Sequence, residues 1–186
     1  FGTLALNHAT GPALSHLPFL LSADGMQADM HLARSNPLLG LLDNPAPVVL
    51  SISGPDGYVS PDWYGVEDQV PTWAYVAVHL RGRVERRPIE ELRAQIEGVS
   101  AAFETRLAGK APWTTDKMRD GVLARMMRAI LPVRLTIESI EGTWKLGQNK
   151  PDAARLRAAD AIEAGSGMEL ALLSALMRSV GDLGEE

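Results

Sequence analysis

Residues 72–86 form the longest strand-like pattern in the chain and constrain the fold more than any other segment. Their side chains alternate, with Tyr75 and His79 on one face and Val76 and Leu80 on the other, as a β-strand requires. Shorter patterns of this kind occupy residues 2–7, 13–21, 28–33 and 47–53. Hairpin-type turns separate them, and Gly54-Pro55-Asp56-Gly57 is predicted to end the last one. Strands at such short spacing favour a closed or sandwich β architecture over a βαβ sheet.

The periodicity becomes helical after Pro88. Apolar residues recur at helical spacing over residues 89–107 and again over 117–130, which predicts two helices. A strand-like run over residues 132–140 then completes the barrel, and Pro151 begins a last helix that is interrupted by the glycines near residue 166. The overall prediction is a mainly β fold of the α+β class with added helices.

Composition limits both the number of domains and the partners. With 186 residues and 46% hydrophobic content, the chain can bury one good core, so we predict a main domain at residues 1–150, a helical insertion within it at about 88–130, and a helical extension at 151–186. The net charge of −5 offers no general basic surface for nucleic acid. The sequence has no cysteine and no apolar run near the roughly 20 residues of a membrane span, so we expect a cytoplasmic protein.

The segment from Gly142 to Pro151 is unusually rich in groups that can bind a ligand. A predicted strand leads into it and a predicted helix leaves it, an arrangement that can direct backbone N–H groups at an anion. Four of its side chains could add to such a site, namely Trp144, Lys145, Gln148 and Asn149. We therefore predict a site for an anion or a planar ring at this elbow.

Four other stretches have both a functional and a structural interpretation. A strand meets a helix start at His31, Arg34, Ser35 and Asn36. These residues could hold a phosphate, or Ser35 could simply cap the helix beside a solvated arginine. His16 lies inside an apolar strand, where a structural role is the commoner one.

Two tryptophans extend this set. Trp63 belongs to a loop with three aromatic residues, which either covers a ring, a partner or the edge of the core. Trp73 opens the long strand and is more often a core residue in such a position.

Common catalytic and metal-binding patterns do not occur in this sequence. It contains no thiol nucleophile, no His-Glu-x-x-His and no phosphate-binding Gly-Lys-Ser/Thr loop. The four histidines have no close spacing that would suggest a metal site, so we predict none. We assign no catalytic residue.

Taken together, these motifs resemble those of the PaiB family, which is described as FMN-binding negative transcriptional regulators. The resemblance runs in order from Phe1 to about Arg157 and rests on His16–Phe19, His31–Pro37, Gly54–Tyr64, Val70–His79 and Gly142–Pro151. It implies an FMN-binding split β-barrel, related to pyridoxamine-phosphate-oxidase-like flavoproteins, that forms a homodimer with flavin at the subunit interface. Two positions depart from the family pattern: Ala74 replaces a common Asn, and Gly147 replaces a common Ser.

The resemblance also implies roles for the residues singled out above. Arg34, Ser35 and Lys145 become candidates for the flavin phosphate, and Trp63, Trp73 and Trp144 for the walls around the isoalloxazine ring. Gln148 and Asn149 would hydrogen-bond the edge of that ring. The remaining cofactor-binding candidates, which would contact the ribityl chain or phosphate or brace the loops, are His16, His31 and Asn36.

Three functions remain open from the sequence. The first is an FMN-binding homodimer of the PaiB type with a regulatory role, the second an FMN-dependent oxidoreductase acting on a small substrate, and the third a dimeric binding module that has lost flavin. Direct DNA binding is doubtful, because the chain is acidic and has no evident helix-turn-helix pattern. The exception is a basic cluster at Arg81, Arg83, Arg86 and Arg87, which more often protects an exposed strand edge from aggregation.

Overall fold

The computed structural model describes residues 1–181, which form two compact units. Unit 1 contains residues 1–52 and 79–141, and unit 2 contains residues 53–78 and, of the remaining described residues, 142–181. The long strands β5 (Ala46–Val59), β6 (Thr72–Arg86) and β7 (Ile130–Lys145) contribute residues to both units. The predicted boundaries at residues 150 and 151 stay a prediction.

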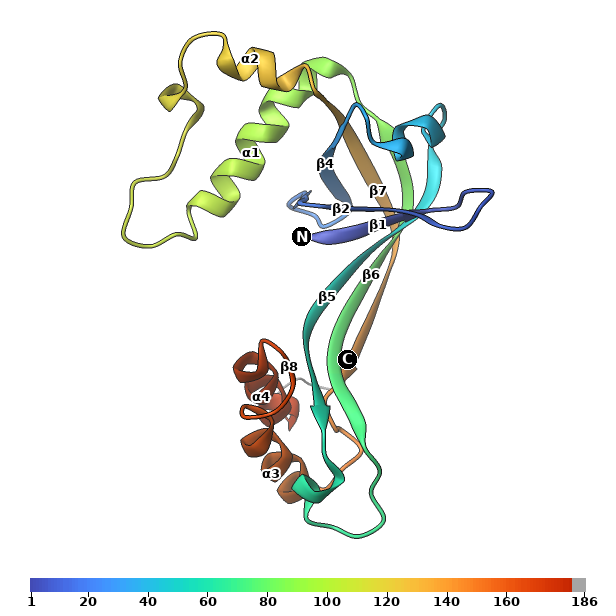
Figure 1. Cartoon of the computed structure of the whole chain (residues 1–186), viewed down its shortest axis with the longest axis vertical. Helices are drawn as coiled ribbons and strands as arrows, with labels where there is room; N and C mark the ends of the chain where they lie inside the picture. Colours follow the sequence, from blue (N-terminus) through green and yellow to red (C-terminus); the bar gives the residue numbers. More distant parts are fainter. Residues whose placement is uncertain (182–186) are drawn as a thin grey trace. The chain divides into compact units, whose positions relative to one another are not determined.

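A single antiparallel sheet of eight strands connects the elements (Figure 1). The shorter strands are β1 (Gly2–Leu6), β2 (Ala13–Leu17), β3 (Leu20–Leu21), β4 (Gln27–Ala33) and β8 (Gly167–Met168). Their order in the sheet is β2-β1-β5-β6-β7-β4-β3, with β8 paired to β5. In unit 1 strand β2 also contacts β4, near the other end of this order, so the sheet curls toward closure. The curl agrees with the closed β architecture expected from the sequence.

Alternating buried side chains build the core of unit 1. Leu4 and Leu6 of β1 point inward, as do Met30 of β4 and Leu135 of β7. Because side chains on a strand alternate between faces, register fixes which residues are buried, and β4 pairs with β7 through Met30 and Val133. Helix α1 (Leu92–Glu104) contacts β3 and β4 and inserts Leu92 into this core. Helix α2 (Val122–Met127) completes the helical insertion.

Unit 2 has its own apolar core around two helices, α3 (Asp152–Ile162) and α4 (Leu170–Arg178). Ile162 of α3 and Met177 of α4 are fully buried there beside Val59 of β5. The buried Arg155 side chain donates from Nε to the carbonyl oxygen of Met177 at 2.8 Å and pairs with Asp152. Its charge is therefore hydrogen-bonded, as a buried guanidinium requires. Within residues 1–181, no helix is both long and apolar enough to cross a bilayer.

The predicted turn at Gly54-Pro55-Asp56-Gly57 is wrong, because all four residues lie inside β5. Gly57 pairs with Gly167 of β8, and a Cβ atom added to Gly57 would lie 2.9 Å from a methyl group of Leu170. The glycine therefore serves the close approach of α4 to the strand rather than a reversal of the chain. Local sequence chemistry cannot distinguish these two uses of glycine.

Several predicted elements exist with different ends. The helix expected over 89–107 is α1 preceded by a 3-10 turn at Ile89–Glu91, and the helix expected over 117–130 is only the short α2. Gly121, which precedes α2, has a left-handed backbone (φ +74°) that interrupts the helical path. Strand β7 continues through Lys145, so the elbow before α3 is shorter than predicted.

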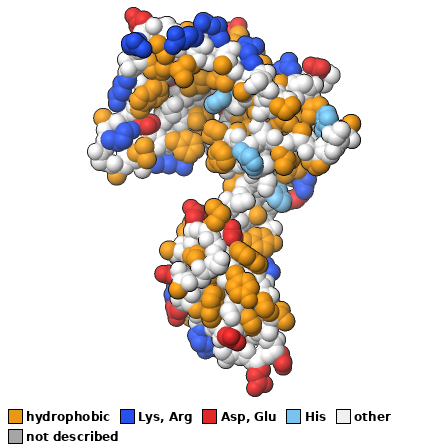
Figure 2. Space-filling model, viewed as in Figure 1, with side chains coloured by type: hydrophobic (Ala, Val, Ile, Leu, Met, Phe, Trp, Pro, Cys, Tyr) orange, Lys and Arg blue, Asp and Glu red, His pale blue; other side chains and the backbone are white. Residues whose placement is uncertain are grey.

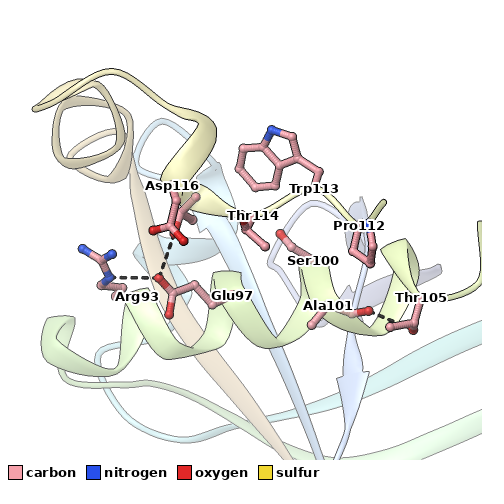
Figure 3. A pocket seen from close by; sticks show the side chains of 10 residues that line it. Arg93, Glu97, Ser100, Ala101, Thr105, Pro112, Trp113, Thr114 and Asp116 are labelled. Carbon is pink, nitrogen blue, oxygen red and sulfur yellow. Dashed lines mark hydrogen bonds and ion pairs between the residues drawn. The ribbon is translucent and has the colours of Figure 1, made fainter. Parts of the chain in front are cut away.

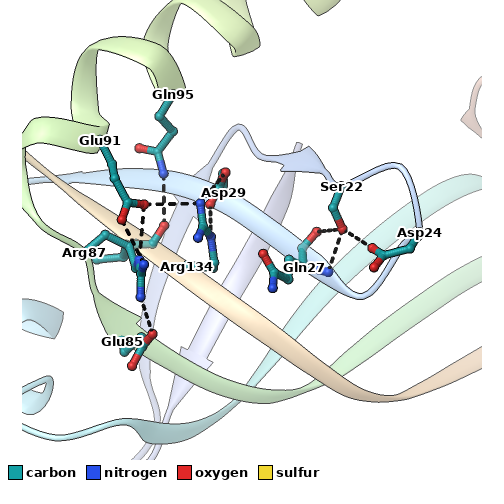
Figure 4. A network of polar contacts seen from close by, with 10 residues as sticks. Ser22, Asp24, Gln27, Asp29, Glu85, Arg87, Glu91, Gln95 and Arg134 are labelled. Carbon is teal, nitrogen blue, oxygen red and sulfur yellow. Dashed lines mark hydrogen bonds and ion pairs between the residues drawn. The ribbon is translucent and has the colours of Figure 1, made fainter.

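A network of arginine and carboxylate side chains holds the start of α1 against the sheet (Figure 4). Arg134 of β7 forms two parallel hydrogen bonds with Asp29 of β4, at 2.6 and 3.0 Å, and lies 3.3 Å from Glu91. Arg87 contacts Glu91 and Glu85, each at 2.8 Å. Paired guanidinium and carboxylate groups of this geometry fix orientation as well as charge.

The hydrogen bond from Arg87, assisted by the nearby charge of Arg134, lowers the pKa of Glu91 below its ordinary value of 4.5. A carboxyl group whose pKa is lowered by folding stabilises the fold above its unfolded pKa, and this contribution is lost as the pH falls through the folded pKa. We therefore expect Glu91→Gln to reduce the free energy of unfolding at pH 7 by more than at pH 3. Urea titrations at both pH values measure this difference.

The neighbouring exposed residue provides the control, since Glu90→Gln should change the free energy of unfolding little at either pH. An equal loss for Glu91→Gln at both pH values would show that the charge of Glu91 is irrelevant to stability.

Candidate functional site

The predicted site residues fall into two groups that belong to different units. His16, His31, Arg34, Ser35 and Asn36 lie in unit 1, whereas Trp63, Trp73, Trp144, Lys145, Gln148 and Asn149 lie in unit 2. The two groups are described separately below.

Arg34 and Asn36 in unit 1 are held by hydrogen bonds at the end of β4. The Nε atom of Arg34 donates to the carbonyl oxygen of Arg128 at 2.7 Å, and its backbone N–H donates to Ala129 at 2.8 Å. Asn36 caps the 3-10 helix Pro37–Leu41, accepting from Leu38 N–H at 3.0 Å. The cap is thus Asn36 and not Ser35, whose side chain is exposed beside it.

The two histidines of unit 1 differ in environment. His16 is exposed on β2, and its Nδ1 lies 2.9 Å from Thr3 Oγ1. His31 is half-buried, and its Nδ1 is inaccessible to solvent and has no hydrogen-bond partner within residues 1–181. Burial lowers the pKa of His31 below 6.5, so the imidazole is neutral at pH 7. A neutral ring can hydrogen-bond a ligand but brings no positive charge to a phosphate.

Two adjoining cavities lie in unit 1, along α1. One has a volume of about 520 Å³ and is lined by His31, by apolar side chains of α1 and α2, and by Trp113. The other, of about 410 Å³, is lined mainly by polar and charged residues and shares Ser100 and Trp113 with the first. Figure 3 shows its ion pair, in which Arg93 Nε lies 3.0 Å from Glu97 Oε1.

In unit 2, four of the predicted residues line one small cavity. Trp73, Lys145, Gln148 and Asn149 surround a volume of about 150 Å³. The sequence did not single out several further lining residues, among them Tyr64, Thr72, Lys150 and Met177. Only Lys150 carries a signal of its own, as a second cation five residues after Lys145 in the same motif.

Two lysines give this cavity, which we call the elbow cavity, its charge. Lys145 Nζ donates to Thr72 Oγ1 at 2.8 Å, across strands β7 and β6. Lys150 Nζ donates to Gln69 Oε1 and lies 5.2 Å from the centre of the Tyr64 ring. Because both lysines line the cavity and bring positive charge to it, the cavity favours an anionic group.

The side-chain amide of Gln148 stabilises the turn between β7 and α3. Its Oε1 accepts from Leu146 N–H at 2.8 Å, and its Nε2 donates to the carbonyl oxygen of Trp144. Gly147 lies inside this turn with a left-handed backbone (φ +81°). Serine at this position would have to adopt a backbone conformation that is unfavourable for residues with a Cβ atom. The left-handed turn therefore explains why glycine, and not serine, occupies position 147.

The three tryptophans have different surroundings. Trp73 is 46% exposed and meets Tyr58 edge to face, with ring centroids 6.4 Å apart. Trp144 is 45% exposed on β7. Trp63 packs against the core of unit 2, in agreement with the core-edge interpretation of its loop. Of the three, only Trp73 lines the elbow cavity.

The donors of the elbow cavity fit part of a flavin mononucleotide. Lys145 and Lys150 could supply cations for a phosphate, Asn149 offers both a donor and an acceptor, and Trp73 presents a flat apolar surface. The volume of about 150 Å³ lies below the roughly 300–1,000 Å³ usual for pockets that enclose such a ligand. The cavity can therefore hold a segment of the cofactor and not all of it.

Comparison with known proteins agrees with this chemistry. A family model described as "Putative FMN-binding domain" matches residues 1–139. The chain belongs to this family. The protease synthase and sporulation protein PAI 2 of Bacillus subtilis is 29% identical over 152 residues, covering 81% of this chain and 72% of that protein. The predicted membership of the PaiB family and the predicted cofactor, FMN, are thereby confirmed.

Solved structures share the fold at low sequence identity. The FAD and heme binding protein from Mycobacterium smegmatis superposes with a TM-score of 0.54 at 20% identity, over 78% of this chain and 65% of that one. The conserved hypothetical protein Rv2991 from Mycobacterium tuberculosis gives a TM-score of 0.50 at 18% identity, over 77% and 76% of the two chains. The predicted split β-barrel with added helices is confirmed as the fold class.

The backbone of Gly147 leads to a prediction about stability. We expect Gly147→Ser to lower the free energy of unfolding by about 1–2 kcal/mol, because the left-handed conformation is unfavourable for a residue with a Cβ atom. Gly147→Asn should lose less, since asparagine tolerates this region better. Thermal and urea unfolding of both variants measure the difference.

Gly40→Ser is a suitable control, because a Cβ atom at Gly40 meets nothing within 4 Å and its backbone is not left-handed. A loss at Gly147 no larger than at Gly40 would contradict the strain interpretation.

Proposed function

We propose that this protein is an FMN-binding homodimer of the PaiB type in which each flavin site draws residues from both subunits. The observation that carries this proposal is the elbow cavity, where Lys145, Asn149 and Trp73 meet around a volume too small for a whole flavin. A second surface must therefore complete the site, and a partner subunit supplies it. When bound, FMN supplies redox chemistry that side chains lack.

The proposed site divides the cofactor between charged and flat surfaces. Arg34, Ser35 and Lys145 bind the phosphate, since a dianion needs fixed cations and donors. The contact between Arg34 Nε and the carbonyl oxygen of Arg128 supports this assignment, because it holds the guanidinium in place. Trp73 and Trp144 flank the ring, and Asn149 hydrogen-bonds its edge.

The other predicted residues have supporting places in the proposed site. Gln148 and Asn36 shape it through the backbone contacts that they already make, and Trp63 supports it from the core of unit 2. His16 is proposed to brace its strand through Thr3.

Exposed apolar side chains on the long strands support dimer formation. Trp144 and Ile140 of β7 are 45% and 58% exposed, and Trp73 of β6 is 46% exposed. A run of exposed residues that includes large apolar side chains is typical of a protein–protein contact surface. We propose that this part of β6 and β7 lies in the subunit interface.

Any regulatory role is proposed to be indirect, through metabolism or a partner. The basic cluster already makes contacts within the chain: Arg81 pairs with Glu141 at 2.7 Å, Arg83 donates to the Pro45 carbonyl, Arg86 to that of Leu39, and Arg87 binds two glutamates. Phosphate binding would compete with these contacts. The absence of cysteine supports a cytoplasmic location.

The phosphate assignment predicts a selective loss of affinity. Arg34→Ala and Lys145→Ala should each lower the affinity for FMN by about tenfold to over a hundredfold. This is the loss expected when one charge-assisted hydrogen bond is removed. Riboflavin has the same ring but no phosphate, so its affinity should change much less. Quenching of flavin fluorescence during titration of the apoprotein measures both affinities.

Arg119→Ala, at an exposed arginine of the helical insertion, is the control and should leave both affinities unchanged. Equal losses for FMN and riboflavin in the two test variants would mean that Arg34 and Lys145 are structural. Failure of the unmodified chain to bind either flavin would contradict the proposed function as a whole.

Mixing the two variants tests whether subunits share the site. If Arg34 and Lys145 of one site come from different subunits, a dimer formed from one Arg34→Ala chain and one Lys145→Ala chain has one unmodified site. After random exchange of subunits, about a quarter of all sites should regain normal FMN affinity. Sedimentation should give about twice 20.1 kDa for the unmodified protein. No recovery in a mixture shown to contain mixed dimers would place both residues in a site within one chain.

A further inference from the structure

The larger cavity of unit 1 has the size of a small-molecule site and takes no part in the proposed flavin phosphate contacts. Its volume is about 520 Å³, within the roughly 300–1,000 Å³ of typical ligand pockets. We call it the insertion cavity, because residues 96–130 of the helical insertion form most of its wall and His31 of β4 forms the rest. In Figure 2, hydrophobic side chains gather beneath the part of the chain that carries α1 and α2.

The lining of the insertion cavity suits an apolar and flat ligand. Its apolar side chains are Ile96, Trp113, Met118, Leu123, Met126, Met127, Ala129 and Ile130. Methionine is flexible and polarizable, adapts to varied shapes and contacts aromatic rings favourably. The indole of Trp113 adds a large planar surface. An aromatic ring therefore gains more binding free energy in this cavity than a polar molecule of equal size.

His31 indicates that the ligand also carries a hydrogen-bonding group. The imidazole lines the cavity. Its Nδ1 is inaccessible to solvent and has no partner among the described residues, so a group in the cavity can meet the ring only through Nε2. Since a neutral imidazole has one donor and one acceptor, a hydroxyl group can bind it in either tautomer.

The lining of this cavity, which has no charged residue among those that the structure describes, also disfavours a charged ligand. The desolvation that lowers the pKa of His31 disfavours any ionised group placed beside it. The charged residues Arg93, Glu97 and Asp116 line the adjoining cavity instead, where Arg93 and Glu97 pair with each other. A carboxylate or ammonium group in the insertion cavity would thus lose its hydration without gaining a counterion from the lining residues.

We propose that the insertion cavity binds a neutral aromatic molecule of one or two fused rings that bears a hydroxyl or similar hydrogen-bonding group. The ring lies among the methionines and Trp113, and the polar group contacts His31. This site is additional to the flavin site, and it does not depend on the phosphate assignment above. If FMN performs redox chemistry in this protein, such a molecule is a candidate for the class of its substrate.

The test uses 2-naphthol as the probe and the whole chain labelled with 5-fluorotryptophan. Four tryptophans give four ¹⁹F signals, and the Trp113→Phe variant identifies the one from Trp113. We expect 2-naphthol to shift the Trp113 signal in a saturable manner. The charged analogues 2-naphthoate and 2-naphthylmethylamine should bind at least about tenfold more weakly, which corresponds to about 1.4 kcal/mol.

Two variants examine the contacts separately. His31→Phe should lower the affinity for 2-naphthol by about tenfold. The affinity for naphthalene, which has no hydroxyl group, should stay nearly unchanged. Leu123→Trp fills the cavity and should abolish binding of both compounds. Leu107→Trp, at an exposed position outside the cavity lining, should retain both. Circular dichroism confirms that each variant folds.

Three outcomes would overturn the proposal. The first is a Trp113 signal that does not respond to 2-naphthol in the unmodified protein. The second is binding of 2-naphthoate as tight as that of 2-naphthol. The third is displacement of 2-naphthol by FMN at the concentration that saturates the flavin site, which would make the insertion cavity part of that site. Because FMN binding is read separately from flavin fluorescence, failure of the second site is distinguishable from failure of flavin binding.

Discussion

Backbone pairing among the three long strands is the constraint on which the rest of the structure depends. β5, β6 and β7 are adjacent in the sheet and supply residues to both compact units. Since their side chains alternate, a shift of one residue would exchange buried Leu80 and Val84 for exposed neighbours in unit 1 and displace Ala74 and Val76 from the core of unit 2. The register of these strands therefore determines which of their side chains are buried in each core.

Polar side chains in this protein have two different roles: some stabilise the fold, and others line a cavity. Arg134, Asp29 and Glu91 satisfy one another and hold helix α1 on the sheet, which leaves little capacity for a ligand. Lys145 and Lys150 instead line a cavity. The hydrogen bonds of their ammonium groups described above go to uncharged oxygen atoms, those of Thr72 and Gln69. Hydrogen bonds to neutral groups orient a cation without neutralising it, so these two lysines keep their attraction for a phosphate.

The helical insertion gives the barrel a second apolar surface. Its helices do not only cover β3 and β4 but also enclose a cavity with His31 at one wall. The low polarity that makes this histidine a poor partner for an anion makes it a suitable partner for a neutral ring. One fold can thus offer distinct sites for a charged cofactor and an uncharged molecule, because burial and charge select opposite ligands.

The sequence by itself determined those features that depend on local periodicity and on recognisable motifs. Alternation identified β6 over Thr72–Arg86, helical spacing identified α1, and the motif series led to the PaiB family and FMN. Only the tertiary structure decided which use each polar or special residue received. Gly57 looked like a turn but allows α4 to approach β5, and Asn36 rather than Ser35 became a helix cap.

The contact between Lys145 and Thr72 joins residues 73 positions apart, and the unpartnered nitrogen of His31 depends on packing by a distant insertion. Local patterns report the conformation of neighbouring residues, whereas these contacts depend on strand register and burial, which the whole fold sets.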